Sequence, residues 1–355
     1  MTEEHFSEYR AQTRVKHAIL KAYLRRWMSI QRGKTGAPRQ FCFVDTFAGQ
    51  GRFETGEEGS PIIAMQTGQE LFDSHKGQVA LTCLFVEIDD SAFVSLEREV
   101  ARAKAQCPSV RAEIRKGAFL DLYSEIQRFK AGNGPALCFV DPFGYSDAPV
   151  DLVSGLLSHR YDEVLVNFMS SFVNRALADE SKADTLTRLY CSEEWRSLQG
   201  QLSAVHLYGR KVQELAAPRR LYVYPVGVSK NASEQYVYHL LHISQHPRGR
   251  QAMEEAVRSS SDFHQLDFEL VQPDVQSEIV KLIDTNGPIL ALDIAGALWL
   301  QEKYWHATWH LDISEALIDL ESAGSIVITH TGGQNRKRGS KPRNSDVVAL
   351  RSGRD

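Results

Sequence analysis

The segment that most constrains the fold is Phe41–Pro61, which reads FCFVDTFAGQGRFETGEEGSP. Its first four residues, Phe41–Val44, are apolar, and such a run is typical of a central parallel strand covered on both faces. Asp45 ends the run. Gly49 and Gly51 follow at a spacing that allows a sharp turn and a close approach of the backbone to a ligand. A glycine pair alone also occurs in ordinary turns, but its position after a buried strand favours a ligand-binding loop.

Further apolar runs alternate with helical patterns along the first two thirds of the chain. The predicted strands after the first one are Ala80–Val86, Val110–Lys116, Ala136–Val140, Glu163–Phe168, Leu221–Val226 and Tyr236–Ile243. This alternation predicts an α/β fold with a mostly parallel sheet. The last two strands are joined by turn residues 230–233, which predicts an antiparallel hairpin at the end of the sheet.

A first helix is predicted over residues 12–30, because Val15, Ile19, Tyr23 and Trp27 recur every four positions. This stripe predicts core packing. Cations on the same helix, Lys16 among them, could line a cofactor or phosphate entrance, but a solvated helix face is the preferred interpretation.

The strand ending in Asp45 and the FAGQG loop resemble motif I of class I S-adenosylmethionine-dependent methyltransferases. The longer strings VDTFAGQGRF, GSP at 59–61 and DPFG at 141–144 are similar to the three-Cys-motif partner (TcmP) family, as are TRVKHAILKAYLRRW and YVYHLLHISQHPRG. The match covers roughly Thr13 to Gly249. It implies a Rossmann-like class I methyltransferase with a mostly parallel seven-stranded sheet, S-adenosylmethionine as cofactor, and a partner protein that carries the three cysteines. The residues that the resemblance places at the cofactor are Asp45, Phe47, Ala48, Gly49, Gly51, Ser60, Glu87, Asp89, Phe119 and Asp121.

Glu87 ends the second predicted strand, where a carboxylate can accept hydrogen bonds from both ribose hydroxyls of a nucleoside. It lies further from Gly51 than the roughly 20 residues of the dinucleotide fingerprint, and the insert 52–60 explains the difference. The alternative is that Glu87 and Asp89 cap the helix predicted at 91–104. Phe119 and Asp121 follow the third strand, where the adenine edge is usually met.

Asp141, Pro142, Phe143 and Tyr145 follow the fourth strand and resemble the [DNS]-P-P-[YF] tetrad of amino-methyltransferases. The resemblance implies that Asp141 and the Pro142 carbonyl accept hydrogen bonds from an exocyclic amine, so that catalysis is mainly positioning. An aromatic from Phe143 or Tyr145 would stack on the base. Phe143 replaces the second proline of the tetrad. The alternative is a strand-end turn with an Asp that faces the cofactor.

The composition limits which binding partners and which cellular compartment are expected. A net charge of −4 and a pI near 6.3 argue against a protein that coats nucleic acid with its whole surface, so a local basic patch is required. No apolar leader and no long apolar window are present, which predicts a cytoplasmic protein. Five cysteines show no metal-ligand spacing, and His239 and His242 alternate along one strand, so no metal site is predicted.

The composition changes after about residue 262. Helices are predicted at Val275–Thr285, Leu290–Lys303 and Leu311–Ala323, and strands at Ser325–Thr329 and Asp346–Leu350. This order resembles a winged helix over 263–355, following a helical segment at 1–38 and a methyltransferase-like domain at 39–262. Its loop, 330–345, carries the basic residues Arg336, Lys337, Arg338, Lys341 and Arg343.

Flexible cations of this kind suit contact with phosphates. The third helix is acidic, with Asp312, Glu315, Asp319 and Glu321, so base reading by it is not expected. A protein–protein role for this domain is about equally supported. The sequence therefore predicts a methyltransferase acting on an amino nitrogen of a nucleic acid base together with a three-Cys-motif partner. The alternative is a silent scaffold that binds nucleic acid or the partner.

Overall fold

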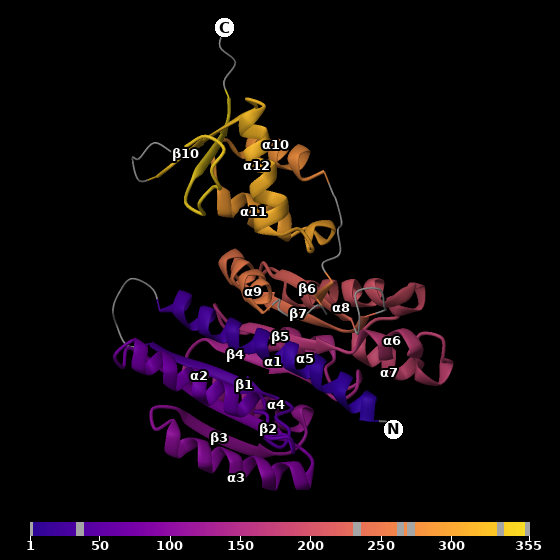
Figure 1. Cartoon of the computed structure of the whole chain (residues 1–355). Helices are drawn as coiled ribbons and strands as arrows, with labels where there is room; N and C mark the ends of the chain where they lie inside the picture. Colours follow the sequence, from indigo (N-terminus) through magenta and orange to yellow (C-terminus); the bar gives the residue numbers. More distant parts are fainter. Residues whose placement is uncertain are drawn as a thin grey trace.

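A computed structural model describes residues 3–32, 39–229, 236–260, 266–267, 274–331 and 337–351, with the backbone alone at 3–11, 39 and 266–267. A large mixed sheet with helices on both faces forms the main body, and a smaller unit with its own sheet follows it (Figure 1). No helix in these ranges is long and apolar enough to cross a membrane.

The large sheet has the strand order β3-β2-β1-β4-β5-β7-β6-β8. These strands are β3 (Arg111–Lys116), β2 (Val79–Glu87), β1 (Arg39–Asp45), β4 (Ala136–Val140), β5 (Glu163–Phe168), β7 (Tyr236–Ser244), β6 (Tyr222–Ser229) and β8 (Leu266–Asp267). Strands β1 to β5 pair in parallel, whereas β7 is antiparallel to both β5 and β6. The predicted terminal hairpin is therefore confirmed, and the two-residue β8 adds an eighth strand to the seven expected.

Two apolar clusters lie on opposite faces of this sheet. One contains residues of α1 (Glu3–Gln31), α2 (Ser60–Ser74), α3 (Asp90–Gln106) and α9 (Pro247–Ser259). The other contains residues of α4 (Phe119–Asn133), α5 (Val150–Gly155), α6 (Ser170–Ala176), α7 (Ala183–Tyr190) and α8 (Gly200–Ala216). In β1, β2, β4 and β5, neighbouring side chains enter opposite clusters, as the pleat requires.

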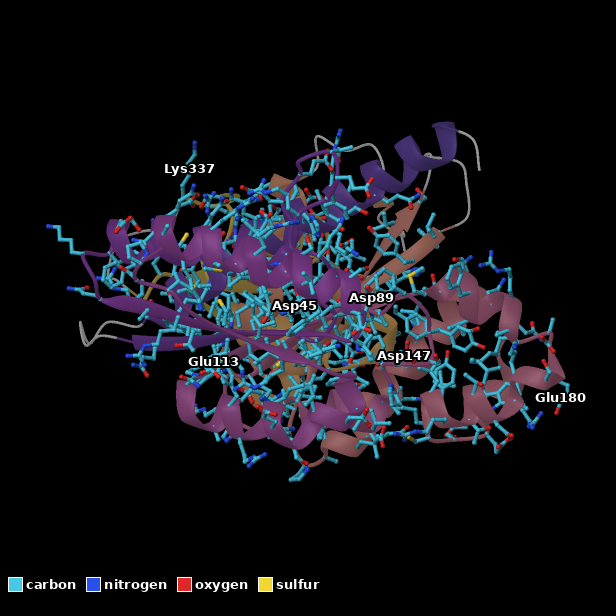
Figure 2. The ribbon with its side chains drawn as sticks, turned by 90° about the horizontal axis from the view of Figure 1, so that it is seen from below. Asp45, Asp89, Glu113, Asp147, Glu180 and Lys337 are labelled. Carbon is cyan, nitrogen blue, oxygen red and sulfur yellow. The ribbon has the colours of Figure 1, made fainter. Side chains whose placement is uncertain are left out.

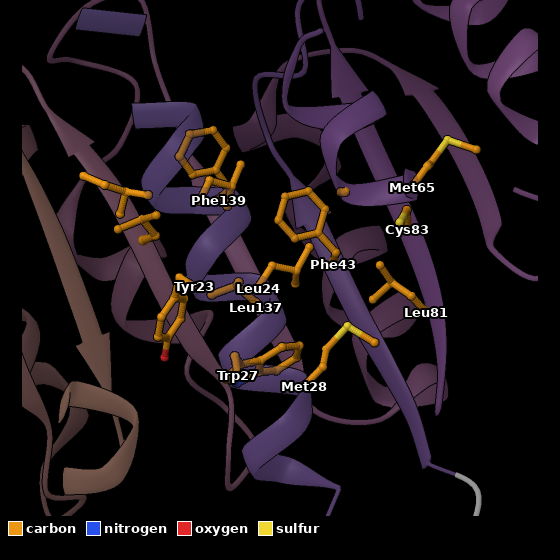
Figure 3. Close-up of a cluster of buried hydrophobic side chains, with 14 of the residues drawn as sticks. Tyr23, Leu24, Trp27, Met28, Phe43, Met65, Leu81, Cys83, Leu137 and Phe139 are labelled. Atoms are coloured by element: carbon orange, nitrogen blue, oxygen red, sulfur yellow. The ribbon is translucent and has the colours of Figure 1, made fainter. Parts of the chain in front are cut away.

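The apolar stripe predicted on the first helix is confirmed as core. Val15, Ile19, Tyr23 and Trp27 are each at most 1% exposed. Figure 3 shows Tyr23 and Trp27 of α1 beside Phe43 of β1 and other core residues of the sheet. Burial of side chains this large contributes about 1.5–3 kcal/mol each, so α1 is an integral layer of the fold.

The predicted strand Tyr236–Ile243 matches β7, which ends at Ser244 before His246 caps α9 and Pro247 occupies its first turn. One helix boundary needs correction. The helix predicted from Leu290 begins at Ala291, because Ile289–Leu290 form a short strand, β9, paired with β11.

The C-terminal unit contains α10 (Val275–Asn286), α11 (Ala291–Trp299) and α12 (Ser314–Ser322), and an antiparallel sheet in the order β10-β11-β9. Strands β10 (Ile326–Thr329) and β11 (Val347–Leu350) match the predicted hairpin closely. The helix predicted from Leu311 instead begins with a π-helical turn at Trp309–Ile313. Three helices and a small antiparallel sheet around one apolar cluster therefore make up this unit.

Candidate active site at the carboxyl edge of the sheet

Four polar side chains meet where the parallel strands end. Asp45, Glu87 and Asn167 lie at the ends of β1, β2 and β5, and Asp141 directly follows β4. The residues two positions earlier in each strand, Phe43, Phe85, Leu165 and Phe139, all belong to the apolar cluster beneath α1. Because side chains alternate along a strand, the four polar groups lie on that same face of the sheet. The carboxyl ends of parallel strands are where open α/β sheets bind ligands.

The glycine loop adopts the backbone conformation that its sequence predicts. Gly49 has φ +61° and Gly51 has φ +80°, a region that side chains other than glycine rarely adopt. A Cβ at Gly51 would lie 3.2 Å from the Cβ of Glu99, whereas a Cβ at Gly49 would meet no atom within 4 Å. The loop is thus packed against α3 at Gly51 and open in front of Gly49.

Glu87 is 3% exposed and is held by two backbone amides. Its Oε2 accepts a hydrogen bond from Gly49 N–H at 2.7 Å, and its Oε1 accepts one from Asp89 N–H at 2.8 Å. A carboxylate has about four lone-pair sites, so two of them stay available for hydroxyl groups of a ligand. The glycine loop and the second strand are in this way joined around one acceptor.

Asp89 has the capping role that the sequence left open. Its side chain accepts hydrogen bonds from Ala92 N–H at 2.8 Å and from the Ser91 hydroxyl at 2.6 Å at the start of α3. The Ser91 hydroxyl, followed by the Ala92 amide, lowers the pKa of Asp89. This capping role accounts for an aspartate at position 89 without any contact to a ligand.

The remaining residues predicted at the cofactor lie around this loop. Phe119 is 2% exposed, and its ring is 5.9 Å from that of Phe47, edge to face. Ala48 N–H donates to the Val86 carbonyl at 2.8 Å, which joins the ends of β1 and β2. Ser60 is buried at the start of α2, and Asp121 is exposed in the first turn of α4.

Asp45 is completely buried beneath the loop, and its Oδ1 accepts a hydrogen bond from Phe47 N–H at 3.2 Å. Burial raises the pKa of Asp45 to about 7; interaction with Ser60 opposes the rise, and the negative charge of Asp141 adds to it. A carboxyl that titrates near neutrality is frequent in active sites.

The raised pKa of Asp45 predicts a pH-dependent stability. Between pH 4 and pH 7 the folded state keeps this proton and the unfolded state releases it, so the free energy of unfolding falls as pH rises to about 7. The Asp45→Asn variant lacks this dependence. The free energy of unfolding of the variant, relative to that of wild type, should therefore rise by up to about 4 kcal/mol between pH 4 and pH 8, at about 1.4 kcal/mol per pKa unit. Urea denaturation at both pH values measures the difference, and a constant difference would contradict the buried, protonated carboxyl.

Asp141 is held between Asn167, which the sequence did not assign to the site, and Lys16, for which the sequence favoured a solvated helix face over a cofactor entrance. Lys16 Nζ of α1 forms an ion pair with Asp141 Oδ2, with side-chain exposures of 11% and 16%. Asn167 Nδ2 donates to Asp141 Oδ1 at 2.7 Å. The solvated interpretation of Lys16 is therefore wrong, because α1 packs flat on the sheet and brings this position over the end of β4. For Asn167 the available signal is a polar residue inside the otherwise apolar run 164–168 of β5.

The residues after Asp141 differ in how far their side chains are exposed to solvent. Pro142 is buried, whereas Phe143 is 72% exposed. Tyr145 is half-buried and packs against the apolar cluster on the α8 face of the sheet. Phe143 is thus the more exposed of the two aromatics, whereas Tyr145 packs into the fold.

The histidines and cysteines considered in the sequence analysis have structural partners or lie inside strands. His239 contacts Ser170 of α6, whereas His242 contacts Glu163 on the α1 face, so the two imidazoles are on opposite sides of the sheet as predicted. All five cysteines are free thiols, and Cys42, Cys83 and Cys138 are buried in strands. In the part of the chain that the structure describes, no three His, Cys, Asp or Glu residues are arranged to hold a metal ion.

The described basic residues of the C-terminal unit can be placed relative to this edge through Lys337. In Figure 2 Lys337 lies at the upper left, apart from Asp89 and Asp147 near the middle of the view, which follow the carboxyl ends of β2 and β4. Arg338 donates to the carbonyls of Glu321 and Ser322 at the end of α12, so it is partly engaged. Lys341 and Arg343 are exposed. Arg336 lies outside the described residues.

Comparisons with known proteins show no family and only distant structural likenesses. No protein-family model and no curated protein matches the chain. Trm1 from Pyrococcus horikoshii, solved with S-adenosyl-L-methionine, is 11% identical and has a TM-score of 0.40, with 95% of this chain and 90% of that one covered. The putative methyltransferase yhhF from Escherichia coli is 14% identical and has a TM-score of 0.29, with 63% of this chain and 85% of that one covered.

Similarities this distant do not assign a substrate or functional residues to this chain. The strand order itself, with β7 antiparallel between β5 and β6, is that of the Rossmann-like class I methyltransferase fold. The TcmP resemblance and its partner protein stay predictions.

Proposed function

We propose that this chain is an S-adenosylmethionine-dependent methyltransferase that modifies an amino nitrogen of a nucleic acid base. The observation that carries the proposal is the shared position of Glu87, the Gly49 loop and Asp141 on one face of the carboxyl edge. The first two fit a nucleoside cofactor, because Glu87 keeps free acceptor sites and the space in front of Gly49 is open. When bound, the cofactor supplies an electrophilic methyl group.

The residues around Asp141 would position the acceptor. Asp141 and the Pro142 carbonyl would accept hydrogen bonds from the acceptor N–H groups and so orient the nitrogen lone pair. Phe143, at 72% exposed, would stack on the base, which is worth about 1–3 kcal/mol in single-strand binders. The nucleophile is therefore held by hydrogen bonds and stacking, and the main contribution of the protein is alignment.

The C-terminal unit resembles a winged helix, and we propose that its basic loop contacts phosphates of the same nucleic acid. Because Lys337 and the carboxyl edge lie apart, the loop would bind a segment remote from the modified base. Its contacts would be salt-dependent and carry little sequence information. A three-Cys-motif partner would act with the enzyme, as the family resemblance implies.

Transfer of a labelled methyl group from S-adenosylmethionine to mixed DNA, RNA and protein tests this function. We expect label in the nucleic acid fraction, with transfer falling as salt rises because phosphate contacts are screened. Label in protein alone would contradict the acceptor class. Cofactor binding without transfer to any fraction would instead favour the alternative, a silent methyltransferase-like scaffold that binds nucleic acid or the partner.

A further inference from the structure

Lys16 is the cation that lies against Asp141 at the proposed acceptor position. Its backbone is fixed, since the neighbouring Val15 of α1 is fully buried, and its Nζ lies 5.9 Å from the centre of the Tyr238 ring. The Tyr238 hydroxyl in turn donates to the Gln12 carbonyl at 2.7 Å, which ties β7 to α1. The ammonium group therefore has a defined place over the end of β4.

The charges around this position nearly cancel. Lys16 and Asp141 form a pair of opposite sign that is mostly shielded from solvent. His17, the next residue of α1, is neutral at pH 7 because burial, with the charge of Lys16, lowers its pKa to about 4. Asp45 is about half-protonated at that pH. Asn167 adds an orienting hydrogen bond without charge.

We infer that Lys16 cancels the charge of Asp141 and thereby restricts the acceptor to an uncharged nitrogen. Asp141 still presents lone pairs to N–H donors, but an ammonium or guanidinium group brought to it would also meet the Lys16 ammonium. Juxtaposed like charges are a common means of rejecting wrong partners. Lys16 is thus a specificity-determining and positioning residue. The exocyclic amines of bases are uncharged and therefore meet the requirement for a neutral acceptor. This inference rests on the proposed function.

The chemistry is consistent with an uncharged acceptor. The nitrogen lone pair forms the new N–C bond while the sulfonium S–C bond breaks and its electron pair stays on sulfur. The product nitrogen then carries one positive charge and releases one proton to solvent. An ammonium acceptor has no lone pair to donate and would first have to lose a proton beside Lys16.

The test uses the full chain with three variants: Lys16→Met and Lys16→Gln remove the charge, and Lys16→Arg keeps it. The probes are a single-stranded oligonucleotide containing adenine and cytosine, and a lysine-containing peptide. In wild type and Lys16→Arg we expect kcat/KM for the peptide to be at least about 100-fold lower than kcat/KM for the oligonucleotide. In Lys16→Met and Lys16→Gln the ratio of peptide to oligonucleotide kcat/KM should rise by about tenfold or more. An unchanged ratio, or a wild-type preference for the peptide, would overturn the inference.

A second readout does not depend on activity. The side-chain amide resonances of Asn167 report its hydrogen bond to Asp141, so they should shift in Lys16→Gln and stay in place in Lys16→Arg. If they shift but wild type methylates neither probe, the proposed function fails and only the positioning role of Lys16 stands. If wild type is active and neither the resonances nor the acceptor ratio changes in Lys16→Gln, the role of Lys16 fails while the proposed function stands.

Discussion

Asp141→Asn should lower the rate of methyl transfer by about 100-fold or more while leaving the affinity for S-adenosylmethionine within about twofold. The substitution keeps the shape of the side chain but replaces an ionic acceptor with a neutral amide, one end of which donates. Lys16 then loses its counter-ion, and Asn167 loses its acceptor unless the amide turns. The acceptor amine would consequently be misaligned, whereas Glu87 and the glycine loop would be unaffected.

The measurements are single-turnover transfer of a labelled methyl group and calorimetric titration of the cofactor. Asp147→Asn is the matched control, because Asp147 is exposed in the same loop and its side chain accepts a hydrogen bond from the neighbouring Ser146 hydroxyl at 2.9 Å. We expect the control to keep the wild-type rate. Retained transfer in Asp141→Asn would show that another group holds the acceptor.

Arg250→Met should lower the free energy of unfolding by about 3–5 kcal/mol, the cost of breaking a buried ion pair. Arg250 of α9 is fully buried, pairs with Glu254 at 3.1 Å, and donates to the carbonyls of Trp305 and Ala307 at 2.9 Å each. Its guanidinium also lies 4.2 Å from the ring centre of Trp299. One arginine of the main body thus holds three residues of the C-terminal unit.

Glu254 strengthens this expectation, since it also accepts hydrogen bonds from Trp309 N–H at 2.8 Å and His310 N–H at 3.2 Å. Without Arg250 its charge would stay buried beside those amides. Arg248→Met is the control: Arg248 is 34% exposed and pairs with Glu255 at 3.4 Å, so its loss should cost under about 1 kcal/mol. Urea denaturation measures both. Equal small losses would contradict a charge-dependent attachment of the C-terminal unit.

The sheet could be predicted from the sequence because its strands are continuous apolar runs. Strand β5 matches its predicted bounds, Glu163–Phe168, and the FAGQG loop takes the positive φ values that its glycines indicated. These signals are local: a strand buried on both faces needs apolar residues throughout, and a left-handed turn favours glycine. The fold class therefore followed from short windows.

The partners of Asp141 could not be predicted in the same way. Lys16 lies 125 positions from Asp141 in the sequence, and a lysine on an amphipathic helix is usually solvated. Its burial depends on how α1 lies across the sheet, which no local pattern specifies. Strand β9 was missed because two residues, Ile289–Leu290, give no periodic signal and are extended only through pairing with β11.

The most direct test of the central claim is calorimetric titration of the full chain with S-adenosylmethionine, beside the Glu87→Leu variant. The account predicts heat from a single site in wild type and its loss in the variant, in which the acceptor at the end of β2 is gone while Asp141 and Lys16 remain. No heat and no thermal shift of wild type with the ligand in excess would contradict it.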